Sequence, residues 1–410
     1  MKSYSIWILL SIFFHPKGLF ANEVDNISRR WEQSALRDAG PLLDDKVNEQ
    51  LQNVVKKYNN PVRSTLAKVF AGSEKCDSDR LEKILKEEFY SQHLLGAFEL
   101  GVESAVKNKK EMSSKGKSLD AHTFDRQNIY RHPDFGKKEH VPSEFYVSAA
   151  NQKIPLASSV SVSGHYVGTD KFGHFFDQGW AFFNEYKKES EPSLKSKRAM
   201  SHTLMTEQGT LGLAGTGVYS FGDLAADLSG GLFWLSATRF EKGAPPSFIK
   251  DSSWAKKVWD KGPFFRCENG QVSLIRKFTW SDFVTDAWDE GINCVDFNPI
   301  YDVGSLSHPN LFNRNVKQLE KQHPGQRYQC PANPEKCTEL KSQYGFYLTS
   351  KILSSDCSGV SKARLRFDLK SEACWYARHH KSEQADFNCS DIPKQEPKDA
   401  PPVVDESHNQ

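Results

Sequence analysis

Two apolar segments that contain ionisable side chains constrain the fold of this chain more than any other feature. The first spans residues 164–186 and the second spans residues 217–234. Each is dense in Phe, Trp and Leu, and its apolar residues recur with helical spacing. We therefore predict two helices that bury their apolar sides against each other.

Each predicted helix carries a pair of ionisable residues four positions apart. Asp170 and His174 form the first pair, and Asp223 and Asp227 form the second. This spacing places both members of a pair on one helical face. If the helices pack together, the pairs meet in an interior of low dielectric constant. We therefore expect His174 to lie within side-chain reach of Asp223 or Asp227.

One interpretation of these residues is a metal site or an acid–base site. Carboxylate and imidazole groups on facing helices suit a divalent metal, which would activate water for hydrolysis. Without a metal, a buried Asp–His pair could transfer protons. The candidate catalytic residues are Asp170, Lys171, His174, Asp223 and Asp227. The candidate metal ligands are Asp170, His174, Asp223 and Asp227, with Asp289, Glu290 and His165 as further candidates.

The other interpretation is a buried structural network. In this network Asp170 serves the helix N-terminus. Lys171 pairs with Asp223 or Asp227. His174 forms a hydrogen bond with Asp227. We favour this interpretation, because structural ion-pair networks produce the same residue pattern without any chemistry.

The first 21 residues have the pattern of a signal peptide. Lys2 precedes an apolar run over residues 6–14, which is too short to span a bilayer, and residues 19–21 offer a cleavage site. An uncleaved anchor is the alternative. In both cases we expect the bulk of the chain in the periplasm or outside the cell. Without Lys2 and Lys17 the formal net charge of +2 becomes 2 − 2 = 0, which does not favour nucleic acid as a partner.

The cysteines agree with export. All eight follow the predicted signal peptide, seven of them lie after residue 266, and no C-x-x-C motif occurs. An even count of this kind is typical of disulfides formed in an oxidising compartment. We predict the pairs Cys267–Cys294 and Cys330–Cys337.

The rest of the pattern predicts a mainly α protein with no transmembrane helix in the mature chain. We expect an irregular helical bundle core with long loops, a minor β hairpin turning at Asn269-Gly270, and a disulfide-bearing C-terminal region. The expected helices outside the two central segments cover residues 24–70, 77–106, 199–213, 311–322 and 340–353. The expected regions are a signal peptide (1–21), an N-terminal helical region (22–117), a central helical core (118–297), a cysteine-rich region (298–391) and a disordered tail (392–410).

Several polar positions receive specific predictions. Thr169 is expected to cap the first central helix. Residues 279–293 are expected to form a helix whose acidic face is solvated, and that face carries Asp282, Asp286, Asp289 or Glu290, and Asn293. Glu207 lies in the middle of the predicted helix over residues 199–213 and is expected to point to solvent.

Three sequence blocks resemble a bacterial family. They read VGTDKFGHF over residues 167–175, SFGDLAA over 220–226 and WSDFVTDAWDEGINC over 280–294. The set is similar to exported bacterial proteins of uncharacterised function. Its D-K-x-x-H-F and D-x-x-x-D-x-x-G elements are distantly similar to VanZ-like proteins and related small periplasmic lipoproteins. The resemblance covers roughly residues 160–297 and implies a bacterial envelope protein with a helical core.

These observations lead to two functional hypotheses. The first is an exported bacterial envelope protein with a structural or binding role, whose partner is a cell-envelope component or another protein. The alternative is a hydrolase of a cell-envelope component that uses a divalent metal or acid–base chemistry.

The signal peptide and the even cysteine count generate a first prediction. The exported chain should start near Asn22 and carry oxidised cysteines, because the compartment favours disulfides. Intact mass after thiol alkylation without reductant should show the loss of the first 21 residues and no alkylated cysteine. Eight alkylated cysteines in the exported protein would contradict it.

Overall fold

The computed structural model of the chain is mainly α-helical. It describes residues 36–60, 75–90, 97–107, 121, 144–147, 152–209, 211–212, 218–297, 317, 320–321, 330–380 and 389. The predicted signal peptide, most of the helix expected over residues 311–322, the tail over 392–410 and the region boundaries at 117 and 391 lie outside the described residues.

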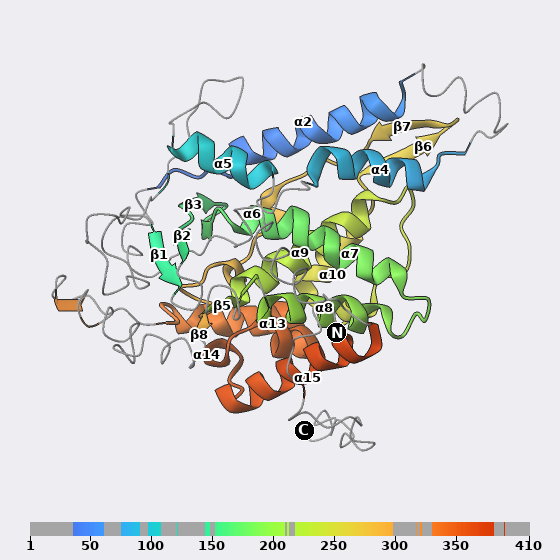
Figure 1. Cartoon of the computed structure of the whole chain (residues 1–410). Helices are drawn as coiled ribbons and strands as arrows, with labels where there is room; N and C mark the ends of the chain where they lie inside the picture. Colours follow the sequence, from blue (N-terminus) through green and yellow to red (C-terminus); the bar gives the residue numbers. More distant parts are fainter. Residues whose placement is uncertain are drawn as a thin grey trace, which may run out of the picture.

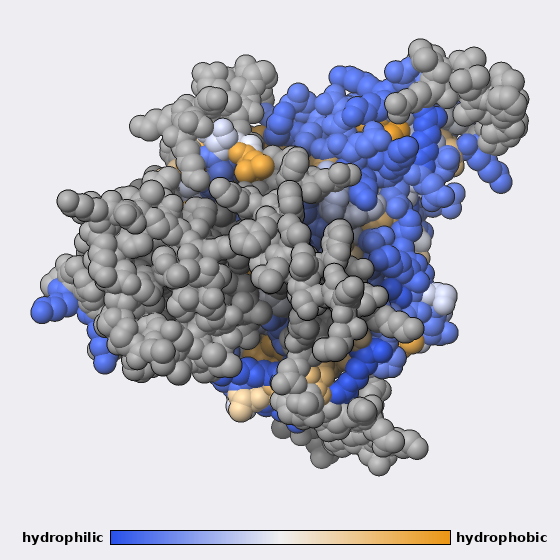
Figure 2. Space-filling view, viewed as in Figure 1, coloured by the Kyte–Doolittle hydropathy of each residue, from blue (hydrophilic) through white to orange (hydrophobic). Residues whose placement is uncertain are grey.

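Three N-terminal helices form an outer layer (Figure 1). They are α2 (Gly40–Tyr58), α4 (Ser78–Phe89) and α5 (Ala97–Lys107). The sequence predicted one helix over 77–106, but α4 ends at Phe89 and α5 begins at Ala97. The Asp77 side chain caps α4 by accepting hydrogen bonds from the backbone N–H groups of Asp79 and Arg80. Figure 2 shows that the outward surface over α2 and α4 is hydrophilic, as expected of amphipathic helices on a core.

The centre of the fold is one long helix packed against two others. This long helix runs without a break through α6 (Lys171–Gly173), the π-helical turn η2 (His174–Gln178) and α7 (Gly179–Lys188). It packs on α8 (Lys195–Gln208) and on α9 (Phe221–Ala237). The predicted phenylalanine stripe is buried as expected, and its members are Phe172, Phe175, Phe176, Phe182 and Phe183. Among the described helices, none combines the length and apolarity needed to cross a membrane.

The β structure consists of four antiparallel strand pairs among the described residues, where the sequence predicted a single hairpin. The pairs are β1 (Glu144–Val147) with β2 (Gln152–Pro155), β3 (Ser159–Val162) with β4 (His165–Gly168), β5 (Val218–Tyr219) with β8 (Asp296–Phe297), and β6 (Phe265–Glu268) with β7 (Gln271–Leu274). The predicted turn at Asn269-Gly270 joins β6 to β7. Both turn residues have positive φ, at 51° and 71°, which is the conformation that two-residue hairpins require.

The C-terminal part forms a second helical layer below the centre (Figure 1). Its helices are α13 (Pro334–Ile352), α14 (Ser355–Ser358) and α15 (Lys362–His380). The elements between α9 and α13 lie nearer the centre and are η3 (Ser247–Ile249), α10 (Ser253–Asp260), η4 (Trp280–Asp282) and η5 (Asp286–Trp288). The helix expected over 340–353 is the second part of α13. Helix α15 was not predicted from the sequence, and it packs along α8.

All eight cysteines form disulfides, but both predicted pairs are wrong. The observed pairs are Cys76–Cys267, Cys294–Cys330, Cys337–Cys357 and Cys374–Cys389. Cys267 pairs with a residue 191 positions away because hairpin β6–β7 packs beside α2 at the start of α4. The remaining three pairs confirm the disulfide-bearing C-terminal region.

A polar cluster fastens α15 to α7 and α8. Glu185 on α7 accepts hydrogen bonds from Arg198 Nε (2.9 Å) and from the hydroxyl of Tyr376 (2.8 Å). The His202 ring lies 5.2 Å from the Tyr376 ring, measured between centroids. Burial lowers the pKa of His202 to about 4, although the Glu185 carboxylate acts in the opposite direction. His202 is therefore neutral at neutral pH.

This partly buried, neutral histidine generates a prediction about acid stability. The folded-state pKa of His202 lies below the ordinary value of 6.5, so its stabilisation is complete above pH 6.5 and is lost as the pH falls towards about 4. Urea unfolding measures the free energy of unfolding of the wild type and of His202→Gln at each pH. The wild-type value minus the variant value should fall by roughly 2–3 kcal/mol when the pH is lowered from 7 to 4. The exposed His379, which lies on α15 whereas His202 lies on α8, serves as the control, and His379→Gln should keep the wild-type pH dependence. Parallel pH profiles for wild type and His202→Gln would refute the assignment.

Candidate functional site

The long central helix begins with a cap that also belongs to the site. The Asp170 side chain accepts a hydrogen bond of 2.8 Å from the backbone N–H of Lys171, so Asp170 is the N-cap and not Thr169 as predicted. The Thr169 hydroxyl instead donates to the buried carboxylate of Glu103. Four residues after Asp170 the helix widens into the π-helical turn that starts at His174. Single π-helical turns are frequent at functional sites.

Glycines bring the second helix, α9, against this turn. A Cβ atom on Gly230 would lie 1.8 Å from the carbonyl oxygen of Phe175, and one on Gly179 would lie 2.6 Å from the backbone of Gly230. Only glycine permits this approach. Ser220 caps α9 by accepting a hydrogen bond from the N–H of Asp223. The close packing places Asp223 beside the long helix.

Lys171 is the centre of the site. Its side chain is fully buried, and Nζ lies 2.8 Å from Asp170 Oδ2, 2.5 Å from Asp223 Oδ1 and 2.7 Å from Glu290 Oε1. An ammonium group has three N–H donors, and here each has a carboxylate oxygen within reach. Burial alone would lower the pKa of Lys171, but the three carboxylates hold that pKa well above its ordinary value. Lys171 is therefore a permanent cation.

His174 is held between two aspartates, as expected from the sequence. Nδ1 lies 2.8 Å from Asp227 Oδ1, and Nε2 lies 3.2 Å from Asp223 Oδ2. Burial opposes the charged ring, but the two carboxylates outweigh it and hold the pKa of His174 well above its ordinary value. The ring is therefore an imidazolium that forms a hydrogen bond with Asp227 through Nδ1 and an ion pair with Asp223 through Nε2. We call Asp170, Lys171, His174, Asp223, Asp227 and Glu290 the charged cluster.

Four carboxyl groups in the charged cluster face two cations, and their pKa values divide accordingly. His174 and Lys171 outweigh burial and lower the pKa of Asp223 below its ordinary value. Burial raises the pKa of Asp170 and that of Asp227 to about 6, against the opposing effect of the neighbouring cations. It raises the pKa of Glu290 to about 7. Near neutral pH the cluster can therefore hold or release a proton.

Further polar groups extend the charged cluster, and the sequence analysis missed their roles. The Ser220 hydroxyl donates to Glu290 Oε1 (2.6 Å), and the Ser220 N–H donates to Glu207 Oε1 (2.7 Å). Glu207 is buried, so its predicted exposure is wrong, and burial raises its pKa well above the ordinary value. Glu99 on α5 is also buried, beside Gly173. Glu99 lies in the first turn of α5 and Glu207 in the last turn of α8, and neither position carries a local signal of burial next to charge.

The predicted solvated acidic helix over residues 279–293 is wrong. Two short 3-10 turns, η4 and η5, replace it. Thr285 is the N-cap of η5, because its side chain accepts a hydrogen bond from the N–H of Ala287, and a new turn therefore begins after Thr285. Asp282 pairs with Lys261 and Arg276. Large side chains on this stretch, including Trp280, Phe283 and Trp288, are all buried, so it has no solvated face.

The further candidate ligands separate in the structure. Glu290 joins the charged cluster through Lys171. The Asp289 side chain accepts a hydrogen bond from the N–H of Gly291. His165 lies 2.9 Å from Asp286, which also pairs with Lys336. The structure therefore places only Glu290 of these three in contact with the centre of the site.

Three members of the cluster have a geometry compatible with a metal. Asp170, His174 and Asp223 each offer a ligand atom, and these atoms lie within 4.8 Å of one another. Asp227 at Nδ1 would orient the ring of a ligating His174, as outer carboxylates do in metal sites. The Lys171 ammonium competes for the same oxygens of Asp170 and Asp223. A metal would therefore have to displace the ammonium from these carboxylates.

The pairing generates a prediction about stability. His174→Ala or Asp227→Ala leaves a charge buried without its partner, so each should lower the free energy of unfolding by roughly 3–5 kcal/mol. The double variant His174→Met with Asp227→Leu should recover part of that loss, because both polar partners are removed together. Chemical denaturation measures these values.

A matched control is available in the His165–Asp286 pair. It has a similar distance, but its side chains are partly exposed. His165→Ala should therefore cost less than about 1 kcal/mol. Equal losses for His165→Ala and His174→Ala would show that burial of the charged cluster contributes nothing.

Comparison with protein-family models, with curated proteins and with solved structures finds no match to this chain. The function therefore has to be inferred from the geometry of the site. That geometry shows a buried Asp/His cluster, completed by Lys171 and Glu290, at the contact of the two central helices.

Proposed function

We propose that this chain is an exported bacterial envelope protein with a structural or binding role, in which the charged cluster locks the helical core. One observation carries the proposal: all three donors of Lys171 and both nitrogens of His174 have carboxylate partners within the fold. Cations that are surrounded by carboxylates in this way are suited to joining segments of the fold. The cluster then acts as a fixed brace between segments distant in the sequence.

Two further observations support the envelope location. All eight cysteines can pair, and such pairing suits an oxidising compartment outside the cytoplasm. The three sequence blocks that resemble exported bacterial proteins include every member of the charged cluster except Asp227, which follows the second block by one residue.

The alternative function is hydrolysis of a cell-envelope component with a divalent metal or by acid–base chemistry. The close approach of Asp170, His174 and Asp223 favours it. Glu290 adds to it, because its Oε2 atom is buried without a hydrogen-bond partner among the described residues and the pKa of its carboxyl is about 7. A carboxyl with such a pKa is suited to proton transfer near neutral pH.

Asp223→Asn distinguishes the two functions. In a structural brace, the variant weakens the pairing of both cations and should lower the free energy of unfolding by about 3 kcal/mol. A chelator should leave the melting temperature of the wild type unchanged. Thermal melts with and without EDTA, on protein purified from the periplasm, measure both effects.

Asp286→Asn is the matched control, since Asp286 pairs with His165 and Lys336 in a partly exposed position. It should melt within about 2 °C of the wild type. Two results together would reject the structural brace in favour of a metal site. They are a lower melting temperature of the wild type in EDTA and an Asp223→Asn variant that is as stable as the wild type.

A further inference from the structure

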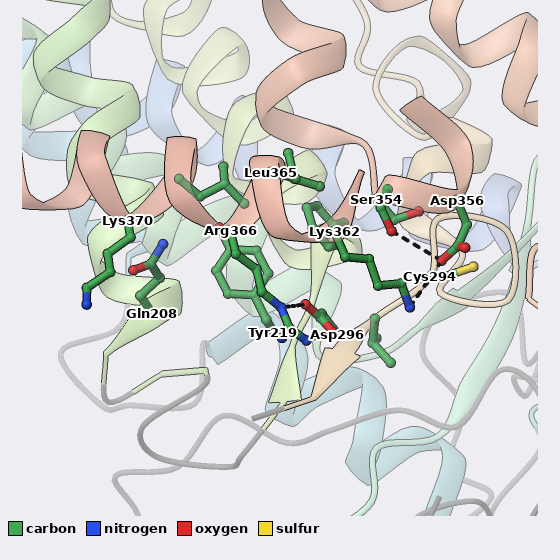
Figure 3. Close-up of a pocket in the computed structure, with 14 residues that line it drawn as sticks. Gln208, Tyr219, Cys294, Asp296, Ser354, Asp356, Lys362, Leu365, Arg366 and Lys370 are labelled. Atoms are coloured by element: carbon green, nitrogen blue, oxygen red, sulfur yellow. Dashed lines mark hydrogen bonds and ion pairs between the residues drawn. The ribbon is translucent and has the colours of Figure 1, made fainter. Parts of the chain in front are cut away.

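A cavity of about 210 Å³ lies between α15 and the strand pair β5–β8. Its wall on α15 includes Lys362, Leu365, Arg366 and Leu369, which recur with helical spacing on one side of that helix (Figure 3). Tyr219 and Phe221 line it from the opposite side. No member of the charged cluster lines it, so it is a separate feature of the molecule.

The inner surface of the cavity is mainly apolar, with polar groups from residues such as Gln208, Tyr219 and Ser354 among its lining. Phe221, Leu365 and Leu369 are almost completely buried, as is the Tyr219 ring. The Tyr219 hydroxyl is buried too, and no described residue forms a hydrogen bond of good geometry with it, although the Gln208 side chain approaches it. A buried hydroxyl without a partner is costly, so the site lacks one hydrogen-bonding group.

The rim of the cavity carries three cations and two aspartates, which are Lys362, Arg366, Lys370, Asp296 and Asp356. Lys362 Nζ is 3.7 Å from Asp356, which is beyond hydrogen-bonding distance, and its side chain is more than half exposed. Figure 3 shows Arg366 reaching across to Asp296, which it binds through two contacts of 2.6 Å. Lys362 is therefore the rim cation best placed to accept an anionic group.

The size of the cavity limits the ligand. A cavity of about 150 Å³ lined by apolar side chains accommodates benzene. The 210 Å³ here has room for one aromatic ring with small substituents. An apolar wall with a few placed polar groups is the usual composition of a small-molecule site.

We propose that this cavity binds a small aromatic carboxylate that bears a ring hydroxyl. The ring packs between Phe221 and the leucines of α15, the carboxylate pairs with Lys362, and the ring hydroxyl accepts a hydrogen bond from Tyr219. This binding activity is independent of the structural role of the charged cluster.

Three related probes separate the contacts. The probes are 4-hydroxyphenylacetate, its neutral amide 4-hydroxyphenylacetamide, and phenylacetate, which lacks the ring hydroxyl. Titration calorimetry or saturation-transfer NMR on the full chain should show 4-hydroxyphenylacetate binding with a Kd on the order of 1 mM or tighter. The amide should bind about tenfold more weakly, and phenylacetate about threefold more weakly.

Variants assign each contact to its residue. Lys362→Gln should weaken 4-hydroxyphenylacetate about tenfold, whereas Lys341→Gln, an exposed lysine on α13 outside the cavity, should not. Tyr219→Phe should bind 4-hydroxyphenylacetate and phenylacetate equally. It should also melt no lower than the wild type, because the hydroxyl it removes has no hydrogen-bond partner of good geometry among the described residues.

Three results would overturn the proposal. The first is the absence of binding by 4-hydroxyphenylacetate at about 10 mM. The second is equal binding of the acid and the amide. The third is an equal effect of Lys362→Gln and Lys341→Gln. A Tyr219→Phe variant that still prefers the hydroxylated probe would remove Tyr219 from the site.

Discussion

The pairing of one buried ammonium group with three carboxylates is the interaction on which the rest of the structure depends. Lys171 joins the start of the long central helix to α9 through Asp223 and to the segment after η5 through Glu290. A buried charge is tolerated only when it is fully paired. The three segments therefore have to meet in one arrangement, because any shift would leave an uncompensated charge in the core.

The apolar packing around the charged cluster also requires the two central helices to approach each other closely. Gly179 and Gly230 allow the backbones of the two central helices to touch. The Phe175 ring fills the adjoining space and packs against Phe233, Phe283 and Trp280, with ring centroids 4.9–5.4 Å apart. Such aromatic contacts exclude water, and the low dielectric strengthens the ion pairs beside them. Charge pairing and aromatic packing thus reinforce each other.

The C-terminal layer is held in a different way. Polar contacts, such as that of Tyr376 with Glu185, fasten α15 to the core. The cavity lies beside this layer, where α15 faces a two-residue strand pair instead of a continuous apolar surface. The charged cluster is buried in the centre, whereas α15 packs on the outside through its own contacts. The molecule can therefore contain both the buried cluster and a small cavity beside α15.

The sequence by itself determined the features that depend on local spacing. It predicted the two central helices, the burial of their apolar sides and the turn at Asn269-Gly270, because helical period and turn chemistry act within a few residues. It also predicted that His174 would contact an aspartate. The i, i+4 spacing places each ionisable pair on one helical face, so the two pairs meet when the helices pack together.

Only the tertiary structure decided which distant groups complete the site and the fold. Glu290 is 119 residues from Lys171, and Cys76 is 191 residues from its partner Cys267. Neither pairing has a local signal, so the sequence assigned Glu290 to a solvated helix and Cys267 to the wrong cysteine. Ser220 and Glu207 were missed for the same reason. Burial of a polar side chain depends on what packs over it, and long-range packing of the whole chain determines that.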